Sequence, residues 1–163
     1  MKKQIVILII FLSASFYASA QVKSQAIGIR GGGNGVINGA EISYQNWLSN
    51  VNRLEFDFGF CANSTHSRLF AIGIYQWDWN IIEGLNWYVG PAAGAGLYAD
   101  DGNPGYLNIA IGGQIGIEYD FNTLDAPILL SLDARPMWDL LGANSGMGWG
   151  AALGIRYTWN SYR

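Results

Sequence analysis

One short stretch of the chain contains residue types that could do nucleophilic chemistry. His66, the only histidine, is followed directly by Ser67, and Asp100 or Asp101 could supply an acidic partner. A histidine that takes the proton of a serine hydroxyl and is oriented by a carboxylate is the arrangement used in acyl transfer. No spacing in the sequence supports this match, and Asn63–Ser67 is predicted to be a polar loop. A solvated loop residue is therefore the favoured interpretation of His66.

Charged residues elsewhere indicate a different kind of chemistry, because they recur at alternate positions along apolar segments. The residues of this kind are Arg30, Glu41, Glu55, Asp57, Glu118, Asp133, Arg135 and Arg156. If these side chains share a closed interior they must be paired, since an isolated buried charge is very costly. We therefore predict a network of ion pairs that fills the interior. A water-filled channel is the alternative, although eight strands enclose a space only just wide enough for side chains.

No metal, cofactor or nucleic-acid site is predicted. Cys61 is the only cysteine, so it cannot form an intramolecular disulfide, and one cysteine with one histidine does not make a metal site. The glycines of Gly31–Gly35 and Gly94–Gly96 do not complete a G-x-G-x-x-G motif or open a helix. Asp100–Asn103 lacks the remaining ligands of a calcium loop. The formal net charge is −3 and no basic run is present, which argues against nucleic-acid binding.

The elements that must position the charged residues are β-strands, because apolar residues recur with a period of two. The last of them is typical: from Trp149 to Trp159 every second residue is apolar or aromatic, and Arg156 lies on the opposite face. The same pattern predicts eight strands in all, at Gln25–Gly32, Gly39–Trp47, Arg53–Ala62, Arg68–Trp79, Leu85–Ala99, Tyr106–Phe121, Pro127–Trp138 and Gly148–Trp159.

Two of these strands depart from simple alternation. Arg68–Trp79 places large apolar residues on the face that should be polar, namely Phe70, Ile72 and Ile74. Either a bulge shifts the register there, or the interior has an apolar zone. In Leu85–Ala99, Pro91 lacks the backbone donor of a sheet ladder, so we expect a local bulge at this residue.

The N-terminus predicts export. Met1–Lys3 is basic, Ile5–Leu12 is apolar and Ala18–Ala20 is a small-x-small cleavage site, so residues 1–20 read as a signal peptide and residues 21–163 as one barrel domain. Half of the chain is hydrophobic and only 13% is charged, against about 25% in soluble domains. An exported chain that is poor in charge and rich in alternating strands indicates a β-barrel in the outer membrane; a secreted β-sandwich is the alternative.

The connections and the aromatic residues suggest which end of the barrel faces which compartment. The tight connections Leu48–Asn52, Asn80–Gly84 and Asn122–Ala126 alternate with the mostly longer Gly32–Asn38, Asn63–Ser67, Ala99–Gly105 and Asp139–Met147. We predict that the tight set is periplasmic and the other set external. Aromatic residues at the predicted periplasmic rim are Trp47, Trp77, Trp79, Trp87, Tyr119, Phe121, Tyr157 and Trp159, and those at the outer rim are Tyr106, Trp138 and Trp149. These would form the two interfacial girdles.

Two segments resemble a known group of proteins. Tyr75 to Pro91 is similar to a strand-turn-strand of the small eight-stranded outer-membrane barrels of the OmpA, OmpX and opacity-protein type, including barrel domains common in Bacteroidetes. The end of the chain, with Gly154, Tyr157 and Trp159, is similar to the Gly-x-x-aromatic-x-aromatic signal read by the barrel-assembly machinery. The resemblance implies an all-β fold: an eight-stranded antiparallel up-and-down transmembrane β-barrel.

The resemblance also implies a location and a range of roles. It implies an integral outer-membrane protein that contacts membrane lipid and lipopolysaccharide, meets the barrel-assembly machinery during biogenesis, and has an envelope protein as a further possible partner. The expected role is non-enzymatic, being structural, adhesive or accessory, with the outer loops as the interaction surface. Some small outer-membrane barrels acylate or deacylate lipid A with histidine, serine and an acidic residue, which makes a lipid-A-modifying enzyme the first alternative. A small pore or carrier for apolar solutes is the second.

Overall fold

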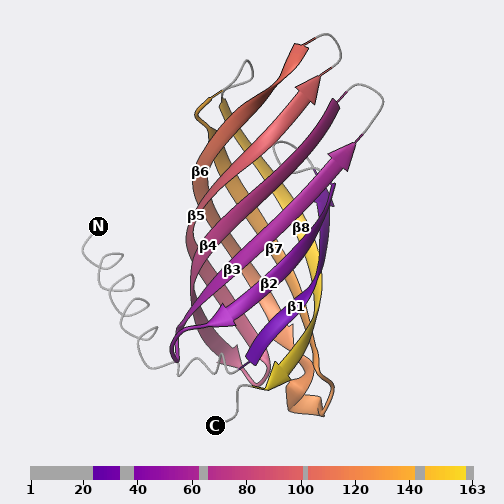
Figure 1. The fold of residues 1–163 in the computed structure, drawn as a ribbon. Coiled ribbons are helices and arrows are strands. Elements are labelled where there is room, and N and C mark those ends of the chain that lie inside the picture. Colours follow the sequence, from indigo (N-terminus) through magenta and orange to yellow (C-terminus); the bar gives the residue numbers. More distant parts are fainter. Residues whose placement is uncertain (1–23, 34–38, 63–65, 101–102, 142–145, 161–163) are drawn as a thin grey trace, which may run out of the picture.

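The alternation of apolar and polar residues produces eight antiparallel strands that close into a barrel (Figure 1). The computed structural model describes residues 24–33, 39–62, 66–100, 103–141 and 146–160. The strands are β1 (Ser24–Gly33), β2 (Gly39–Trp47), β3 (Asn52–Ala62), β4 (His66–Ile82), β5 (Leu85–Asp100), β6 (Asn103–Asp120), β7 (Ile128–Asp139) and β8 (Gly146–Asn160). The 3-10 helix η2 (Phe121–Leu124) precedes β7. The predicted all-β, up-and-down, eight-stranded fold is confirmed.

Closure of the barrel removes both sheet edges. β1 pairs with β2 on one side and with β8 on the other, and the β1–β8 register runs from Ser24 opposite Asn160 to Gly33 opposite Ala151. The start of the first strand and the end of the last therefore lie at the same end of the barrel. Every strand is thus hydrogen-bonded to a neighbour on both sides, as a sheet that faces hydrocarbon requires.

The two faces of the barrel are inverted relative to a soluble protein. Ile29, Phe58 and Ile115 point outward and are each at least half exposed, while the charged residues between such positions are almost fully buried. A period of two puts successive side chains on opposite faces, so one register sets the environment of every residue in a strand. Among the described residues, no helix is long and apolar enough to cross a membrane.

The open question about the fourth strand is resolved in favour of an apolar zone in the interior. Phe70, Ile72 and Ile74 are buried, and they lie on the same inward face as the buried Gln76. The β4–β5 register stays constant from His66 to Asn80, so no bulge separates the apolar part of the strand from the polar part. The three side chains form an apolar cluster with Ala92 and Met137.

Phe70 occupies its place because the residue opposite it has no side chain. Gly59 on β3 pairs with Phe70, and a Cβ atom at Gly59 would lie only 2.0 Å from Cζ of the Phe70 ring. Gly59→Ala is therefore expected to lower the free energy of unfolding by about 1–3 kcal/mol, since overpacking forces a ring out of its rotamer. Chemical denaturation of the refolded barrel measures this loss.

A neighbouring glycine supplies the control for that experiment. A Cβ atom at Gly73 on β4 would make only ordinary contacts with the Phe56 ring, the nearest at 3.8 Å. Gly73→Ala should leave the unfolding free energy within about 0.5 kcal/mol of the parent. Equal effects of the two substitutions would show that the Phe70 ring does not depend on the space at Gly59.

The bulge predicted at Pro91 is wrong. Pro91 lies opposite Gly113 in the β5–β6 ladder, and residues on both sides of it keep the same register. The β4–β5 ladder also has one register on either side of this position, with Ile74 opposite Ala92 and Trp77 opposite Val89. One missing donor can be tolerated without an inserted residue, because the flanking ladder bonds to both neighbouring strands hold the strand in place. Register shifts occur instead near the strand ends, between Asn80 and Ile82 and between Tyr98 and Asp100.

The lengths of the connections differ from the prediction at one end of the barrel. Strands β4, β5 and β6 extend further than their apolar alternation, so only residues 63–65 and 101–102 lie between strands where longer segments were expected. At the other end, the tight connections include 83–84, where Gly84 has a positive φ of 78°. The segment 121–127 contains η2 and is longer than predicted. Ladder pairing needs only backbone groups, so polar residues continue a hairpin beyond its apolar part.

Candidate functional site

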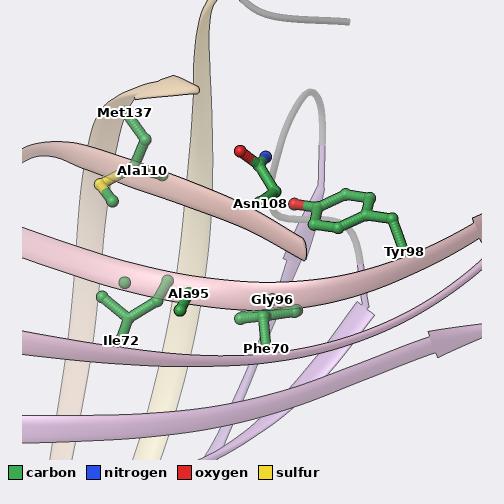
Figure 2. A pocket seen from close by; sticks show the side chains of 9 residues that line it. Phe70, Ile72, Ala95, Gly96, Tyr98, Asn108, Ala110 and Met137 are labelled. Carbon is green, nitrogen blue, oxygen red and sulfur yellow. The ribbon is translucent and has the colours of Figure 1, made fainter. Parts of the chain in front are cut away.

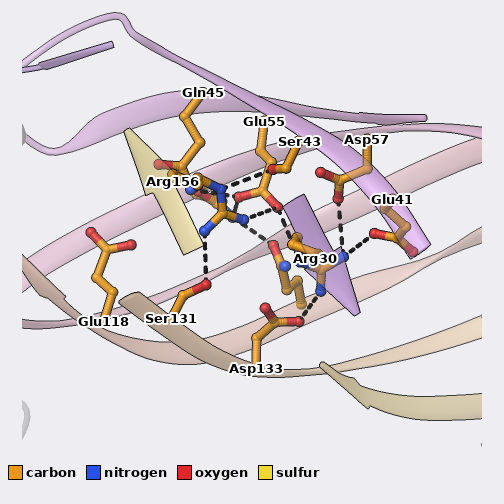
Figure 3. A network of polar contacts seen from close by, with 12 residues as sticks. Arg30, Glu41, Ser43, Gln45, Glu55, Asp57, Glu118, Ser131, Asp133 and Arg156 are labelled. Atoms are coloured by element: carbon orange, nitrogen blue, oxygen red, sulfur yellow. Dashed lines mark hydrogen bonds and ion pairs between the residues drawn. The ribbon is translucent and has the colours of Figure 1, made fainter. Parts of the chain in front are cut away.

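The inward faces bring the predicted charged residues together in the interior of the barrel (Figure 3). Four arginines and six carboxylates lie there, each at most 3% exposed. The arginines are Arg30, Arg53, Arg135 and Arg156, and the acids are Glu41, Glu55, Asp57, Asp78, Glu118 and Asp133. We call these ten residues the lumen network. It contains all eight residues predicted from the sequence, together with Arg53 and Asp78.

Arg30 and Arg135 form the part of the network that crosses between distant strands. Arg30 on β1 donates to Glu41 and Asp133 and, at 3.3 Å, to Oδ2 of Asp57. Arg135 on β7 donates to Asp57 and, at 3.3 Å, to Oε2 of Glu41. The two guanidinium groups therefore share two carboxylates. Hydrogen bonds between ionised groups are the strongest kind available to pair a buried charge.

Arg156 on β8 donates a hydrogen bond from each of the three nitrogens of its guanidinium group. Its Nε donates to Oγ of Ser43 at 2.9 Å, its Nη1 to Oγ of Ser131 at 2.7 Å and its Nη2 to Oε1 of Glu55 at 3.1 Å. These partners come from β2, β7 and β3. Gly154 makes room for this arrangement, because a Cβ atom there would lie 3.0 Å from Nη1 of Arg156.

A second part of the network is centred on Arg53. Arg53 binds Glu118 with two parallel hydrogen bonds of 2.7 and 2.6 Å, and its guanidinium carbon lies 4.9 Å from the centre of the Tyr88 ring. Gln76 joins this part to the first: it accepts from Nε of Arg53 and donates to Oε2 of Glu55 at 2.9 Å. The fork of the guanidinium group matches the two carboxylate oxygens, which fixes both side chains.

Arg53, Gln76 and Asp78 were missing from the set predicted from the sequence. All three lie on the inward face of predicted strands, so the alternation that identified the other charged residues also applied to them. The long-range partners could not be predicted in this way. Arg156 and Ser43 are 113 positions apart in the chain, and only barrel closure brings them into contact.

Asp78 is the member of the network with the poorest pairing. It is fully buried, and neither carboxylate oxygen accepts a hydrogen bond in the described part of the chain, although Nη1 of Arg53 lies 3.1 Å from Oδ2 in an ion pair. Glu118 already holds the fork of the same arginine. Six carboxylates face four guanidinium groups, so Asp78 is an excess negative charge in this part of the lumen.

Neutralising Asp78 is therefore expected not to destabilise the barrel. Asp78→Asn should leave the free energy of unfolding unchanged or raise it by about 1 kcal/mol, because it removes an incompletely paired buried charge. Glu118→Gln should instead lower it by about 3 kcal/mol, since it leaves Arg53 without its fork partner. Denaturant midpoints of the two variants test this contrast, and a larger loss for Asp78→Asn than for Glu118→Gln would contradict it.

Most of the predicted girdle residues lie on the outward face near the strand ends. At the end with the tight connections these are Trp77, Trp79, Trp87, Tyr119, Tyr157 and Trp159; Trp138 and Trp149 lie toward the other end. Trp79 stacks on Trp87 with ring centres 4.7 Å apart, and Trp159 stacks on Tyr44 at 6.2 Å. The first contact joins the neighbouring strands β4 and β5, and the second reaches across β1 from β8 to β2.

Two of the predicted girdle residues lie on the inward face instead. Trp47 is paired with Arg53, an inward residue, and its Nε1 is buried. Tyr106 is paired with Tyr98 and stacks on it at 5.5 Å, inside the barrel mouth. Each sits at a strand end where its position in the alternation, and not its aromatic character, decides the face.

The residues of the possible acyl-transfer set lie at the end of the barrel opposite the tight connections. The Cα atoms of His66 and Asp100 are partners in the β4–β5 ladder, which places the two residues opposite each other. Their side chains, and all of Asp101, lie outside the described residues. Ser67 is exposed. The set therefore stays a prediction. No group of three or more potential metal ligands occurs in the described ranges.

The fold is similar to two solved structures. The N-terminal β-barrel domain of Pseudomonas aeruginosa OprF shares 13% identity and a TM-score of 0.68, with 85% of this chain and 98% of that chain covered. Neisserial surface protein A (NspA) shares 15% identity and a TM-score of 0.56, with coverages of 83% and 96%. No protein-family model and no curated protein matches the sequence. At such identities the likeness concerns architecture, and by this measure the chain has the fold of the small eight-stranded outer-membrane β-barrels.

Proposed function

We propose that the chain is an integral protein of the outer membrane with a structural, adhesive or accessory role and no enzymatic activity. The observation that carries this proposal is the inverted distribution of polarity: apolar side chains cover the outside of a closed barrel, and charges occupy its inside. Exposing that apolar outer surface to water would cost free energy, whereas exposing it to hydrocarbon would not. Membrane lipid and lipopolysaccharide are the partners that such a surface requires.

The lumen network is proposed to act as a plug. Its ten charged side chains come from β1, β2, β3, β4, β6, β7 and β8, and hydrogen bonds and ion pairs join them across the interior. An eight-stranded barrel leaves room for little more than its own side chains. The protein would then work through its surface and its outer connections, with an envelope protein as a possible partner. Those connections (34–38, 63–65, 101–102 and 142–145) lie outside the described residues.

Two further parts of this proposal concern biogenesis. Residues 1–20 would be removed as a signal peptide, so that the mature chain starts at Gln21, and N-terminal sequencing of protein from membranes tests this directly. Gly154, Tyr157 and Trp159 on the last strand would be read by the barrel-assembly machinery. The outward positions of Tyr157 and Trp159 support this role, because side chains on that face are accessible to another protein.

The plug is tested by electrical recording in a planar bilayer. We expect no large, steady single-channel currents from the refolded protein, and we expect the same protein to run as a heat-modifiable band on gels, which reports a barrel that stays folded in detergent. Steady currents would contradict the plug while leaving the membrane location intact. A monomer that is soluble without detergent would contradict the location itself.

A further inference from the structure

A partner of this protein must bind to its surface, because the interior is filled. The lumen network occupies one part of the interior, and the hollow among Phe70, Tyr98 and Met137 in the other part has a volume of only about 20 Å³ (Figure 2). That volume holds about one water molecule. A surface for a protein partner must therefore lie beyond the aromatic rims, outside the hydrocarbon.

Exposed apolar residues and exposed acids occur together at the end of the barrel with the tight connections. Ile81 and Ile82 end β4 and are 56% and 66% exposed, and Leu124 on η2 is 63% exposed. Glu83 directly follows Ile82, Asp125 directly follows Leu124, and both acids are exposed. We call these five residues the acidic platform.

The acidic platform lies beyond the aromatic rim. Ile82 is three residues past Trp79 on β4, and Leu124 is five residues past Tyr119 in the chain. Aromatic side chains of a membrane protein lie at the level of the lipid headgroups, so residues past them face the aqueous compartment. This placement rests on the proposed membrane location of the protein. Carboxylates are also repelled by anionic headgroups, so a lipid surface does not fit the platform.

Hydrogen bonds hold the two segments of the acidic platform in place, with η2 at the lower end of the barrel in Figure 1. The carbonyl of Gly84, which follows Glu83, accepts from the backbone N–H of Asp120 at 2.7 Å. Oδ1 of Asp120 accepts from the backbone N–H of Asn122 at 2.9 Å, and Nδ2 of Asn122 donates to Oγ1 of Thr158 on β8 at 2.8 Å. A surface that is already ordered loses little conformational entropy when a partner binds.

We propose that the acidic platform binds a basic, amphipathic segment of another protein, a periplasmic one because the tight connections are predicted to face the periplasm. Apolar side chains of that segment cover Ile82 and Leu124, and its lysines or arginines lie against Glu83 and Asp125. An apolar centre with a polar rim is the usual composition of a protein interface. Among the described residues at this end, every charge outside the lumen network is acidic, so the complementary charge must come from the partner.

The binding test uses the refolded barrel in phosphatidylcholine nanodiscs, which leave both ends accessible, and a fluorescent amphipathic peptide of lysine and leucine as the probe. The fluorescence anisotropy of the peptide is expected to rise in a saturable way, beyond the rise that empty nanodiscs give, and the affinity is expected to fall as salt is added. A peptide with glutamate in place of lysine should bind no better to filled than to empty nanodiscs. Equal binding of the lysine peptide to filled and empty nanodiscs would overturn the proposal. A protein that stays soluble without detergent and does not enter the nanodisc would contradict the membrane location instead.

Two double variants separate the charged and the apolar parts of the acidic platform. Glu83→Gln with Asp125→Asn removes both charges and should weaken binding of the lysine peptide about five-fold, because each exposed ion pair contributes modestly. Asparagine tolerates the positive φ of 60° at position 125, so this variant keeps the backbone. Ile82→Ser with Leu124→Ser removes the apolar centre and should weaken binding about ten-fold.

Leu48→Ser is the matched control. Leu48 is 49% exposed in another tight connection at the same end, but residues 48–52 contain no acid, so its replacement should leave the affinity unchanged. Unchanged affinity in both double variants, or an equal loss in Leu48→Ser, would overturn the assignment of the site. The replaced side chains are exposed, so each variant should still give the heat-modifiable band. If the serine double variant does not give that band, the variant that removes the two charges decides the question alone.

Discussion

Arg30→Met is expected to lower the free energy of unfolding of the barrel by about 3–5 kcal/mol, the usual cost of leaving buried charges without their partner. Arg30 donates to Glu41, Asp57 and Asp133, and all four side chains are at most 3% exposed. The interior already contains more carboxylates than guanidinium groups. Removing one cation leaves three acids competing for the remaining arginines, without access to water.

The origin of this loss is tested by a second substitution in the same chain. Arg30 and Glu41 are directly opposite each other in the β1–β2 register, so Glu41→Gln removes one of the carboxylates that Arg30→Met leaves unpaired. The double variant should be more stable than Arg30→Met alone by at least about 1 kcal/mol. The midpoints of unfolding of the refolded proteins in guanidinium chloride measure both effects. A loss below about 1 kcal/mol for Arg30→Met, or no recovery in the double variant, would contradict a network held together by charge pairing.

Ile115→Arg is expected to cost about 2–4 kcal/mol of folding free energy when the protein is in a lipid bilayer. A transmembrane strand needs about 9–11 residues to cross the hydrocarbon. Tyr119 on β6 belongs to the aromatic rim near the tight connections, so the middle of the bilayer falls about five residues away, close to Ile115. Ile115 points outward and is 51% exposed. A charge at this depth would lie in hydrocarbon.

The control is the same substitution nearer the other end of the same strand. Leu107 also points outward and is 54% exposed, but along β6 it lies eight positions further from the aromatic rim at Tyr119 than Ile115 does. Leu107→Arg should cost only about 0–1 kcal/mol, because the penalty for arginine falls toward the interface. Denaturant unfolding in vesicles compares the two variants. Equal costs would show that the apolar outer surface is not covered by a bilayer at the depth we assign.

The interior and the exterior of the barrel depend on each other through strand register. A slip of one residue in β3 would turn Glu55 and Asp57 outward and bring Phe56 inward, so a single error would place two charges in hydrocarbon. Burying the acids also requires their partners from β1, β7 and β8, which arrive only when the barrel closes. The network is therefore expected to select one register as well as to fill the lumen.

The sequence by itself determined the type, number and approximate limits of the strands and the inward position of eight of the ten charged residues in the lumen network. Alternation carries this information because a strand has a period of two in any tertiary context. The inward position of Arg156, for example, follows from its neighbours Ile155 and Tyr157 alone. The all-β fold follows as well, since eight amphipathic strands can bury their polar faces by closing on themselves.

Only the tertiary structure decided which arginine meets which acid, and which inward face is apolar. Arg30 and Asp133 are 103 positions apart, and no local pattern predicts that they meet. The apolar start of β4 looked equally compatible with a bulge, and it is accommodated because Gly59, Gly94 and Gly96 on neighbouring strands leave room for its side chains. The sequence also did not predict that β4, β5 and β6 extend beyond their apolar alternation. Each of these features depends on side chains or backbone from another strand, and strand pairing brings those partners together only in the closed barrel.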